Sequence, residues 1–595
     1  KRVVLTYKPS ASAGNRGVAF RWPADPAAPT SSEIDSAQAA LLNKNASGAT
    51  DANGATRLNY LRGDPSREVR NCSSCIPQYR NRSASVLGDL VDSAPVYVGP
   101  PNGPTNDVSM VSFQIANRNR AGMVYVGSND GMMHGFDATS GEERLAYVPN
   151  LVFANLPLLT DTGYVHRYFV NGSPVVESVK LSTGWRTLLV AGLHAGGKGL
   201  FALDVTNPAA MTEAAINAKA IARWEFTDAD MGHVYGKPIL AKTNDDKWSV
   251  IVSNGYLSTN GHAVLYVIDA ETGQVTRKID TGSGSPSAPN GLSPAVAVDL
   301  DANGTVDAVY AGDLEGNLWK FNLKSTVGSG WEVANNVALF QTQKIATAVN
   351  RQSITARPDV TTFPGGGQMI TFGTGQYLDT ADLSNRDVQS LYGVVDNYAA
   401  YTAPLTVSSL QPQNWINNAV ASADYLVSTH AVGAVSTAQR SFTGDNAIST
   451  ADYYQNKRGW YLNLTNFNGE RAEQDIVIRD GRVHAVTTVP QSTQCQSDGN
   501  SEEIVIDTLT GNRIETGLFD TNGDGVFDNT DLLAVPGSSG VTSPSARVLG
   551  QSFSSSPLLL RDKHGNLLSI KSKAGGGGGG GGDDGRPDVD KEKGA

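Results

Sequence analysis

Oxygen-bearing side chains alternate through a short loop between residues 299 and 307. They are Asp299, Asp301, Asn303 and Asp307, with Gly304 at the tight corner. A hard cation such as Ca²⁺ takes about six to eight oxygen ligands. Alternating positions of a tight loop turn their side chains toward one centre, and the main-chain carbonyl of Thr305 adds another oxygen. The spacing therefore predicts a calcium site.

This loop differs from a complete EF-hand loop at its twelfth position. Tyr310 stands where an EF-hand carries a bidentate Glu. Asp307 and water are therefore expected to complete the coordination shell. The alternative interpretation is an ordinary Asp/Asn/Gly turn whose carboxylates are only solvated.

A second acidic loop covers residues 520–531 and follows the EF-hand spacing more closely. Its side-chain oxygens stand at positions 1, 3, 5, 9 and 12, in Asp520, Asn522, Asp524, Asp528 and Asp531. Gly525 occupies position 6, and the Val526 carbonyl position 7. Only the terminal Glu is replaced, by Asp531, so the pattern predicts a second calcium site. A solvated turn is again the alternative.

Two short motifs near the start of the sequence concern recognition and redox state. Arg62, Gly63 and Asp64 form the tripeptide that many integrins bind, although most such tripeptides are ordinary surface turns.

Cys72 and Cys75 form a Cys-x-x-Cys without the second pair or nearby histidines that zinc needs. We expect a local disulfide in an oxidising compartment. Cys495 stands alone and its state is not assigned.

The sequence contains none of the common catalytic motifs. There is no Gly-x-Ser-x-Gly elbow, no P-loop and no His-Glu-x-x-His, and the eight histidines are scattered without metal-ligand spacing. We therefore expect a protein that is not an enzyme.

The elements that position these loops form a repeat of short apolar strands and Gly-centred turns. Five clear copies, spaced 58–64 residues apart, begin at Val124, Leu188, Ile251, Val309 and Met369, and two weaker ones cover 476–486 and 558–570. A repeat made only of strands predicts an all-β propeller of about seven blades with long insertions. An array of β-sandwiches is the alternative.

Composition suggests three segments and excludes some partners. Residues 1–85 show little periodicity, 86–570 carry the repeat, and 571–595 contain eight consecutive glycines and are expected to be disordered. The net charge of −11 argues against nucleic acid as the partner. No apolar run approaches the roughly 18 residues that span a bilayer. The sequence begins without a signal peptide, as a fragment or processed product does.

A set of ordered landmarks resembles a known family. The blade motifs 130–137 and 315–321 resemble quinoprotein-type propellers. Further landmarks are 60–64, 92–95, 299–307, 372–378 and 459–462. In this order they are similar to the C-terminal propeller of the PilC/PilY-type tip adhesins of bacterial type IV pili. The resemblance covers roughly residues 1–570, and the family's N-terminal half has no counterpart here.

The resemblance implies an exported, non-enzymatic propeller at the pilus tip or outer surface. Its partners would be minor pilins of the tip complex and a host-cell receptor such as an integrin. Calcium at the 299–307 loop would control pilus extension against retraction, and Arg62-Gly63-Asp64 would contribute to attachment. Two alternatives stay open. One is a quinoprotein dehydrogenase that uses Ca²⁺ to hold pyrroloquinoline quinone, and the other is a purely structural envelope scaffold.

Overall fold

The structure is a computed structural model of the 595-residue chain. It describes residues 2–82, 85–103, 107–345, 351–415, 425–426, 432–433, 448–449, 453, 455–490, 500–514, 517–524, 526–534, 541–550, 554–561, 567–571 and 588–592. These residues form two compact units. The first contains residues 1–292, 299–307 and 323–331, and the second contains 293–298, 308–322 and 332–595.

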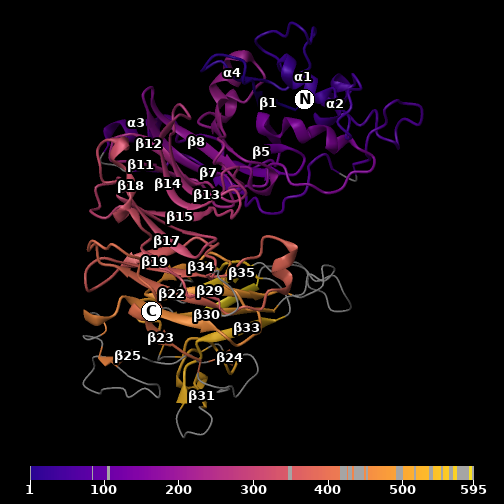
Figure 1. The fold of residues 1–595 in the computed structure, drawn as a ribbon. Helices are drawn as coiled ribbons and strands as arrows, with labels where there is room; N and C mark the ends of the chain where they lie inside the picture. Colours follow the sequence, from indigo (N-terminus) through magenta and orange to yellow (C-terminus); the bar gives the residue numbers. More distant parts are fainter. Residues whose placement is uncertain are drawn as a thin grey trace. The chain divides into compact units, whose positions relative to one another are not determined.

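The first unit is built on three sheets whose strands are mostly antiparallel (Figure 1). The first sheet has the order β2-β1-β6-β5-β4-β3. Its strands are β1 (Val4–Tyr7), β2 (Gly17–Ala19), β3 (Val96–Val98), β4 (Met123–Ser128), β5 (Met132–Asp137) and β6 (Glu143–Val148). The second, β10-β9-β8-β7, contains β7 (Val175–Leu181), β8 (Gly184–Gly192), β9 (Leu200–Asp204) and β10 (Ala222–Phe226). The third runs in chain order through β11 (Ile239–Lys242), β12 (Trp248–Ser253), β13 (His262–Asp269) and β14 (Val275–Gly284).

The first unit also contains short helices, each in a connection between two strands. The α-helices are α1 (Ser36–Leu42), α2 (Gly54–Leu61), α3 (Val108–Ala116) and α4 (Ala215–Ile221). The 3₁₀ helices are η1 (Asn150–Thr160), η2 (His194–Gly196), η3 (Pro208–Ala210) and η4 (Gly328–Gly330). Among the described residues, no helix is long and apolar enough to cross a membrane.

The second unit contains three larger sheets. In the first, β15 (Leu292–Val298), β16 (Ala308–Asp313), β17 (Asn317–Asn322) and β18 (Glu332–Val333) follow in order, and β19 (Phe340–Gln341) also pairs with β17. The next has the order β20-β21-β22-β27-β23, with β20 (Asp359–Thr362), β21 (Gln368–Gly373), β22 (Gln389–Asp396), β23 (Gln411–Gln413) and β27 (Gly459–Leu464). The third, β24-β33-β30-β29-β28, contains β24 (Tyr425–Leu426), β28 (Val477–Arg479), β29 (Arg482–Val489), β30 (Asn500–Asp507) and β33 (Ala546–Gly550).

Smaller elements complete the second unit. A three-stranded sheet is formed by β34 (Leu558–Arg561), β35 (Leu567–Lys571) and β36 (Asp588–Glu592). Two-stranded sheets pair β25 (Val432–Gly433) with β26 (Ile448–Ser449), and β31 (Leu533–Ala534) with β32 (Val541–Thr542). The 3₁₀ helices are η5 (Ala334–Asn336), η6 (Thr380–Ser384), η7 (Val407–Ser409) and η8 (Asn529–Asp531).

The predicted repeat is confirmed strand by strand. The seven copies correspond to the antiparallel neighbours β4–β5, β8–β9, β12–β13, β16–β17, β21–β22, β28–β29 and β34–β35. Each pair lies in a different sheet. The turn at Asp480-Gly481 has φ angles of 52° and 72°, the left-handed pair that a tight two-residue hairpin needs. In the other weak copy of the repeat, 558–570, the corresponding Gly565-Asn566 pair lies outside the described residues.

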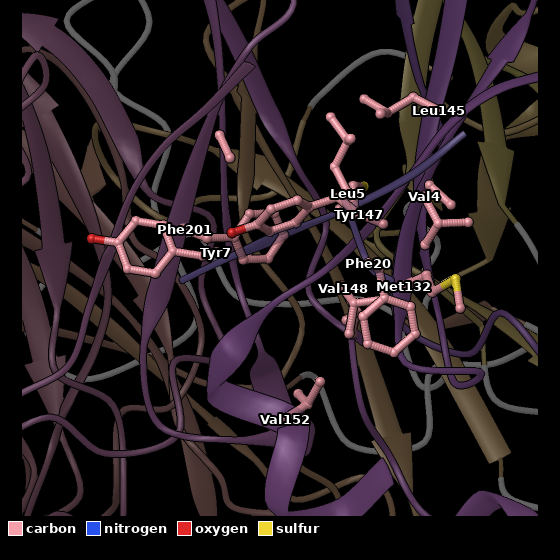
Figure 2. Close-up of a cluster of buried hydrophobic side chains, with 14 of the residues drawn as sticks. Val4, Leu5, Tyr7, Phe20, Met132, Leu145, Tyr147, Val148, Val152 and Phe201 are labelled. Atoms are coloured by element: carbon pink, nitrogen blue, oxygen red, sulfur yellow. The ribbon is translucent and has the colours of Figure 1, made fainter. Parts of the chain in front are cut away.

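The core of the first unit shows how apolar side chains hold neighbouring sheets together. Figure 2 shows Leu5, Tyr147 and Phe201 side by side, although they come from β1, β6 and β9. The rings of Tyr147 and Phe201 are 5.2 Å apart between centroids, and both side chains are fully buried. Each such aromatic side chain removes roughly 150–250 Å² from water. Packing between sheets is therefore a main source of stability.

The two ends of the chain differ from the segments that the sequence suggested. Residues 1–85 show little periodicity in the sequence, but β1 pairs with β6 in parallel and with β2 in antiparallel orientation. Residues 4–7 and 17–19 are therefore part of the first sheet. Likewise, disorder was expected over 571–595, yet Lys571 ends β35 and Asp588–Glu592 forms β36 against it. β1, β2 and β36 have only 4, 3 and 5 residues, and strands this short carry little periodic signal. Residues 572–587 and 593–595 lie outside the described residues.

Candidate metal centre

The loop 299–307 connects β15 and β16, which are neighbours in their sheet. It brings the carboxylates of Asp299, Asp301 and Asp307 together, with one oxygen of each within 4.8 Å of the others. Asp299 and Asp301 are exposed, whereas Asp307 is only 4% exposed. Among the described residues, this is the only group of three or more acidic, His or Cys side chains with such spacing.

The backbone of the loop folds around Asp299. Its carboxylate accepts hydrogen bonds from the main-chain N–H groups of Asn303 (3.2 Å) and Gly304 (2.7 Å). Although desolvation raises the pKa of Asp299, these N–H donors outweigh it and lower that pKa. Gly304 has φ +88°, as its predicted place at the corner requires, and Ala302 shares the left-handed region with φ 58°. The carboxylate therefore stays ionised at the centre of the turn.

Asp307 is held from outside the loop by Asn244, which follows β11. The Asn244 amide donates from Nδ2 to Asp307 Oδ1 at 3.1 Å, and the Leu300 N–H donates to Asp307 Oδ2 at 2.9 Å. Asn244 also donates to the Val306 carbonyl at 2.9 Å, and its own Oδ1 accepts from the Thr305 hydroxyl at 2.8 Å. Sequence reasoning missed Asn244, because nothing in the sequence connects it to a loop about sixty residues away.

The oxygens of this loop fit the ligand preference of calcium. All the candidate ligands are carboxylate, amide or carbonyl oxygens, which suit a hard cation. Asn303 Oδ1 accepts from the Thr305 N–H at 2.8 Å and so faces back into the loop. Tyr310, at the position of the EF-hand Glu, is not a ligand candidate, since it is fully buried in β16 and its hydroxyl donates to Asp396 at 2.7 Å.

The second acidic loop is arranged differently. Asp520 accepts from the N–H groups of Gly523 and Asp524 at 2.7 and 3.1 Å. Asp531 is fully buried and accepts from the N–H groups of Thr521 and Asp528 at 2.8 and 3.0 Å. In the described part of this loop, no three carboxylates lie within 4.8 Å of one another. Gly525 lies outside the described residues, and Asn522, Asp524, Val526 and Asp528 are exposed.

Arg62 of the Arg-Gly-Asp tripeptide is turned into the protein. It follows α2, and its guanidinium forms an ion pair of 2.6 Å with Glu213 and donates to the Phe20 carbonyl at 2.8 Å. Its side chain is 14% exposed. Gly63 has φ +108°, and Asp64 is exposed while accepting from the Ser66 N–H at 2.9 Å. Only the carboxylate of the tripeptide therefore faces solvent.

Cys72 and Cys75 form a disulfide with their Cα atoms 5.5 Å apart. The pair lies in the loop that follows α2, in the same segment as the Arg-Gly-Asp tripeptide. Cys495 lies outside the described residues.

Comparison with known proteins identifies the family. The PilY1 β-propeller domain family matches residues 87–425, more than half of the chain. The chain belongs to the PilY1 β-propeller family. Its fold is accordingly the all-β propeller that the strand repeat predicted. The crystal structure of the Pseudomonas aeruginosa PilY1 C-terminal domain matches 80% of this chain and 97% of its own, with a TM-score of 0.61 and 30% identity.

Full-length PilY1 relatives are longer than this chain. The type IV pilus biogenesis factor PilY1 of P. aeruginosa strain PAK is 35% identical over 520 residues, covering 80% of this chain and 42% of its own length. A PilY1 homolog of Xylella fastidiosa is 34% identical over 488 residues, covering 76% of this chain and 31% of its own length. The chain thus spans less than half the length of the curated relatives it matches.

Proposed function

We propose that this chain is the propeller of a type IV pilus biogenesis factor and that its 299–307 loop is a regulatory calcium site. Membership of the PilY1 family supports the pilus role. The observation that carries the calcium site is the gathering of the Asp299, Asp301 and Asp307 carboxylates within 4.8 Å. The proposed surroundings are the cell surface and the pilus tip, with the minor pilins of the tip complex as partners.

Electrostatics explains why this loop would respond to calcium. Two like charges about 4 Å apart repel by about 1 kcal/mol in water, and more strongly where solvent is excluded. The loop holds three carboxylates that close to one another. A divalent cation would replace this repulsion with attraction, so its binding would stabilise the loop conformation that gathers the oxygens.

Regulation follows if the loop has two conformations with different calcium affinities. A ligand shifts a conformational equilibrium only by its differential affinity for the two states. Calcium would favour the gathered loop, and the free loop would relax as the carboxylates separate. We propose that these two states support pilus extension and retraction to different degrees.

The test combines calorimetric Ca²⁺ titration of chelator-treated protein with measurement of surface piliation. Asp301→Asn is the informative variant, because Asp301 is exposed and accepts one loop N–H that an amide oxygen can also accept. Glu142→Gln is a matched control, since Glu142 is an exposed acid on another loop. We expect Asp301→Asn to weaken calcium binding and change the balance of extended and retracted pili.

Different results would support different functions. Calcium binding without any change in piliation would mean that the ion only stabilises an envelope scaffold. Dye-linked alcohol oxidation after addition of pyrroloquinoline quinone would instead indicate a quinoprotein dehydrogenase. The pilus role is favoured over that enzyme because the relatives carry the name of pilus biogenesis factors.

Attachment to host cells is a further part of the proposal. Asp64 is the group of the Arg-Gly-Asp tripeptide that can reach a receptor-bound metal, since it is exposed. Arg62 could reach an integrin only by leaving Glu213 and the Phe20 carbonyl. We therefore propose that integrin binding, where it occurs, depends on Asp64 more than on Arg62.

A further inference from the structure

A cavity of about 1030 Å³ opens in the first unit beside the 299–307 loop. Its walls come from the segment before α3 and its start, from β7 and the turn to β8, and from the turn between β11 and β12. The end of β13 with the turn after it and residues 302–304 complete them. The volume is slightly above the range of about 300–1000 Å³ that is common for ligand sites. The cavity is therefore large enough to hold one or two amino-acid side chains of a partner.

Two tryptophans, Trp185 and Trp248, form an aromatic part of the cavity wall. The rings of Trp185 and Trp248 are 6.0 Å apart between centroids and meet at 69°. Trp185 is almost buried, and its indole N–H donates to Ser109 at 2.9 Å. Trp248 is partly exposed and lines the cavity. The Nζ of Lys180 already lies 5.9 Å from the centroid of the Trp185 ring, so this wall attracts a cation within the protein itself.

The charged groups of the wall leave an excess of negative charge. The lining carboxylates are Asp107, Glu177, Asp246, Asp269 and Glu271, and the lining cations are Lys180, Lys242 and Lys247. Each lysine has an acidic partner, in Asp107, Asp246 and Asp269 respectively. Glu271 accepts hydrogen bonds from Ser182 only, among the contacts of the described residues. Glu177 has no side-chain hydrogen bond or ion pair within the described part of the chain and is exposed toward solvent.

We infer that this cavity binds a cationic side chain, arginine or lysine, presented by a partner polypeptide. Trp248 supplies the aromatic face, and a planar guanidinium stacks on such a face better than an ammonium group does. Glu177 supplies an uncompensated carboxylate on the same wall. Arginine is therefore the preferred ligand. The cavity shares residues 302–304 with the proposed calcium loop, but Glu177 and Trp248, which carry the inference, lie outside that loop.

The experiment measures binding of a fluorescently labelled tetra-arginine peptide by anisotropy. Saturating Ca²⁺ is present, so that the carboxylates of 299–307 are neutralised and do not attract the peptide themselves. The control peptide replaces every arginine with citrulline, which keeps the shape of the side chain and removes its charge. We expect at least tenfold weaker binding of the citrulline peptide. Glu177→Gln and Trp248→Leu should each weaken binding of the arginine peptide at least fivefold.

Matched variants keep the result interpretable. Glu142→Gln removes an exposed acid that does not line the cavity and should leave binding unchanged. Trp248 also packs against the core of the first unit. If Trp248→Leu lowers the unfolding temperature, Glu177→Gln therefore carries the test alone, since Glu177 is exposed. Equal binding of the two peptides, binding that Glu177→Gln leaves intact, or preference for a tetra-glutamate peptide would each overturn the inference. Loss of binding in Asp301→Asn but not in Glu177→Gln would also overturn it.

Discussion

Asn244 and Asp307 lie 63 residues apart in the sequence and are joined by a hydrogen bond of 3.1 Å from Nδ2 to Oδ1. The same amide group donates to the Val306 carbonyl and accepts from the Thr305 hydroxyl. One side chain thus fixes three consecutive residues of the candidate metal loop. Preorganisation of this kind reduces the cost of ordering a site when the ligand binds.

Asn244→Ala should therefore weaken calcium binding although Asn244 is not a candidate ligand. We expect about tenfold lower affinity in calorimetry. The free energy of unfolding should fall by about 1–3 kcal/mol, because buried acceptors lose their donor. Asp301→Asn should lower the affinity while leaving the calcium-free unfolding temperature nearly unchanged. Identical calcium affinities of wild type and Asn244→Ala would show that the amide does not position the loop.

The second acidic loop offers a contrast between a buried and an exposed carboxylate. Asp531→Ala should destabilise the protein by about 1.5–3 kcal/mol, because the buried Asp531 accepts two main-chain N–H groups. Asp524→Asn should leave stability unchanged, since Asp524 is exposed. If this loop binds calcium, its carboxylates must first move together, so its titration event should be weaker than that of 299–307. The prediction would be wrong if a second calcium-binding step were as tight as that of 299–307 and were lost in Asp524→Asn.

Arg62 is expected to matter for folding more than for recognition. Arg62→Ala leaves Glu213 without its 2.6 Å partner in a place where the Glu213 side chain is only 7% exposed. Removing one member of a fully buried pair costs about 3–5 kcal/mol. The cost is smaller here because Arg21 remains as a second ion-pair partner of Glu213. We therefore expect a loss of about 1–3 kcal/mol in denaturant unfolding.

Asp64→Asn is the matched variant for adhesion to integrin-coated surfaces. It should keep the unfolding midpoint and lose any attachment that depends on the tripeptide. Arg62→Lys, which keeps a positive charge, should retain most of that attachment. If Arg62→Ala is stable and loses adhesion while Asp64→Asn keeps it, Arg62 contacts the receptor directly.

The stability of the first unit should depend on pH through His134. Its ring nitrogens lie 2.7 Å from Glu143 and 3.1 Å from Asp130, and its side chain is 1% exposed. Desolvation lowers the pKa of His134, but the two carboxylates outweigh it and raise that pKa to about 9. A raised pKa means that the folded state holds the proton more tightly than the unfolded state does. The stabilisation is therefore complete below about pH 6.5 and is lost as the pH rises toward 9.

Denaturant titrations between pH 6 and 10 would measure this effect. The loss should be on the order of 3 kcal/mol for the wild type. His134→Gln should be less stable at pH 6 and should show a flatter profile. If the free energy of unfolding of His134→Gln falls equally steeply at alkaline pH, groups other than His134 cause the pH dependence.

Sequence patterns predicted the parts of this fold that depend on local spacing. The turn at Asp480-Gly481 and the corner at Gly304 were predictable because few residues other than glycine, asparagine and aspartate tolerate positive φ. The pairing of β1 with β6 and the contact of Asn244 with Asp307 were not, because both join distant segments. The direction of the Arg62 side chain was equally hidden, since it depends on Glu213.

The parallel pairing of β1 with β6 also has a consequence for the order of synthesis. Thr6 bonds to the carbonyl of Val148, which lies 142 residues later in the chain. A ribosome adds about 5–20 residues per second, so roughly 7–30 s pass before this partner exists. During that interval β1 can pair with β2 but its other edge lacks β6, and open edges are prone to pair with other chains. The parallel side of β1 is therefore paired only after β6 has been synthesised.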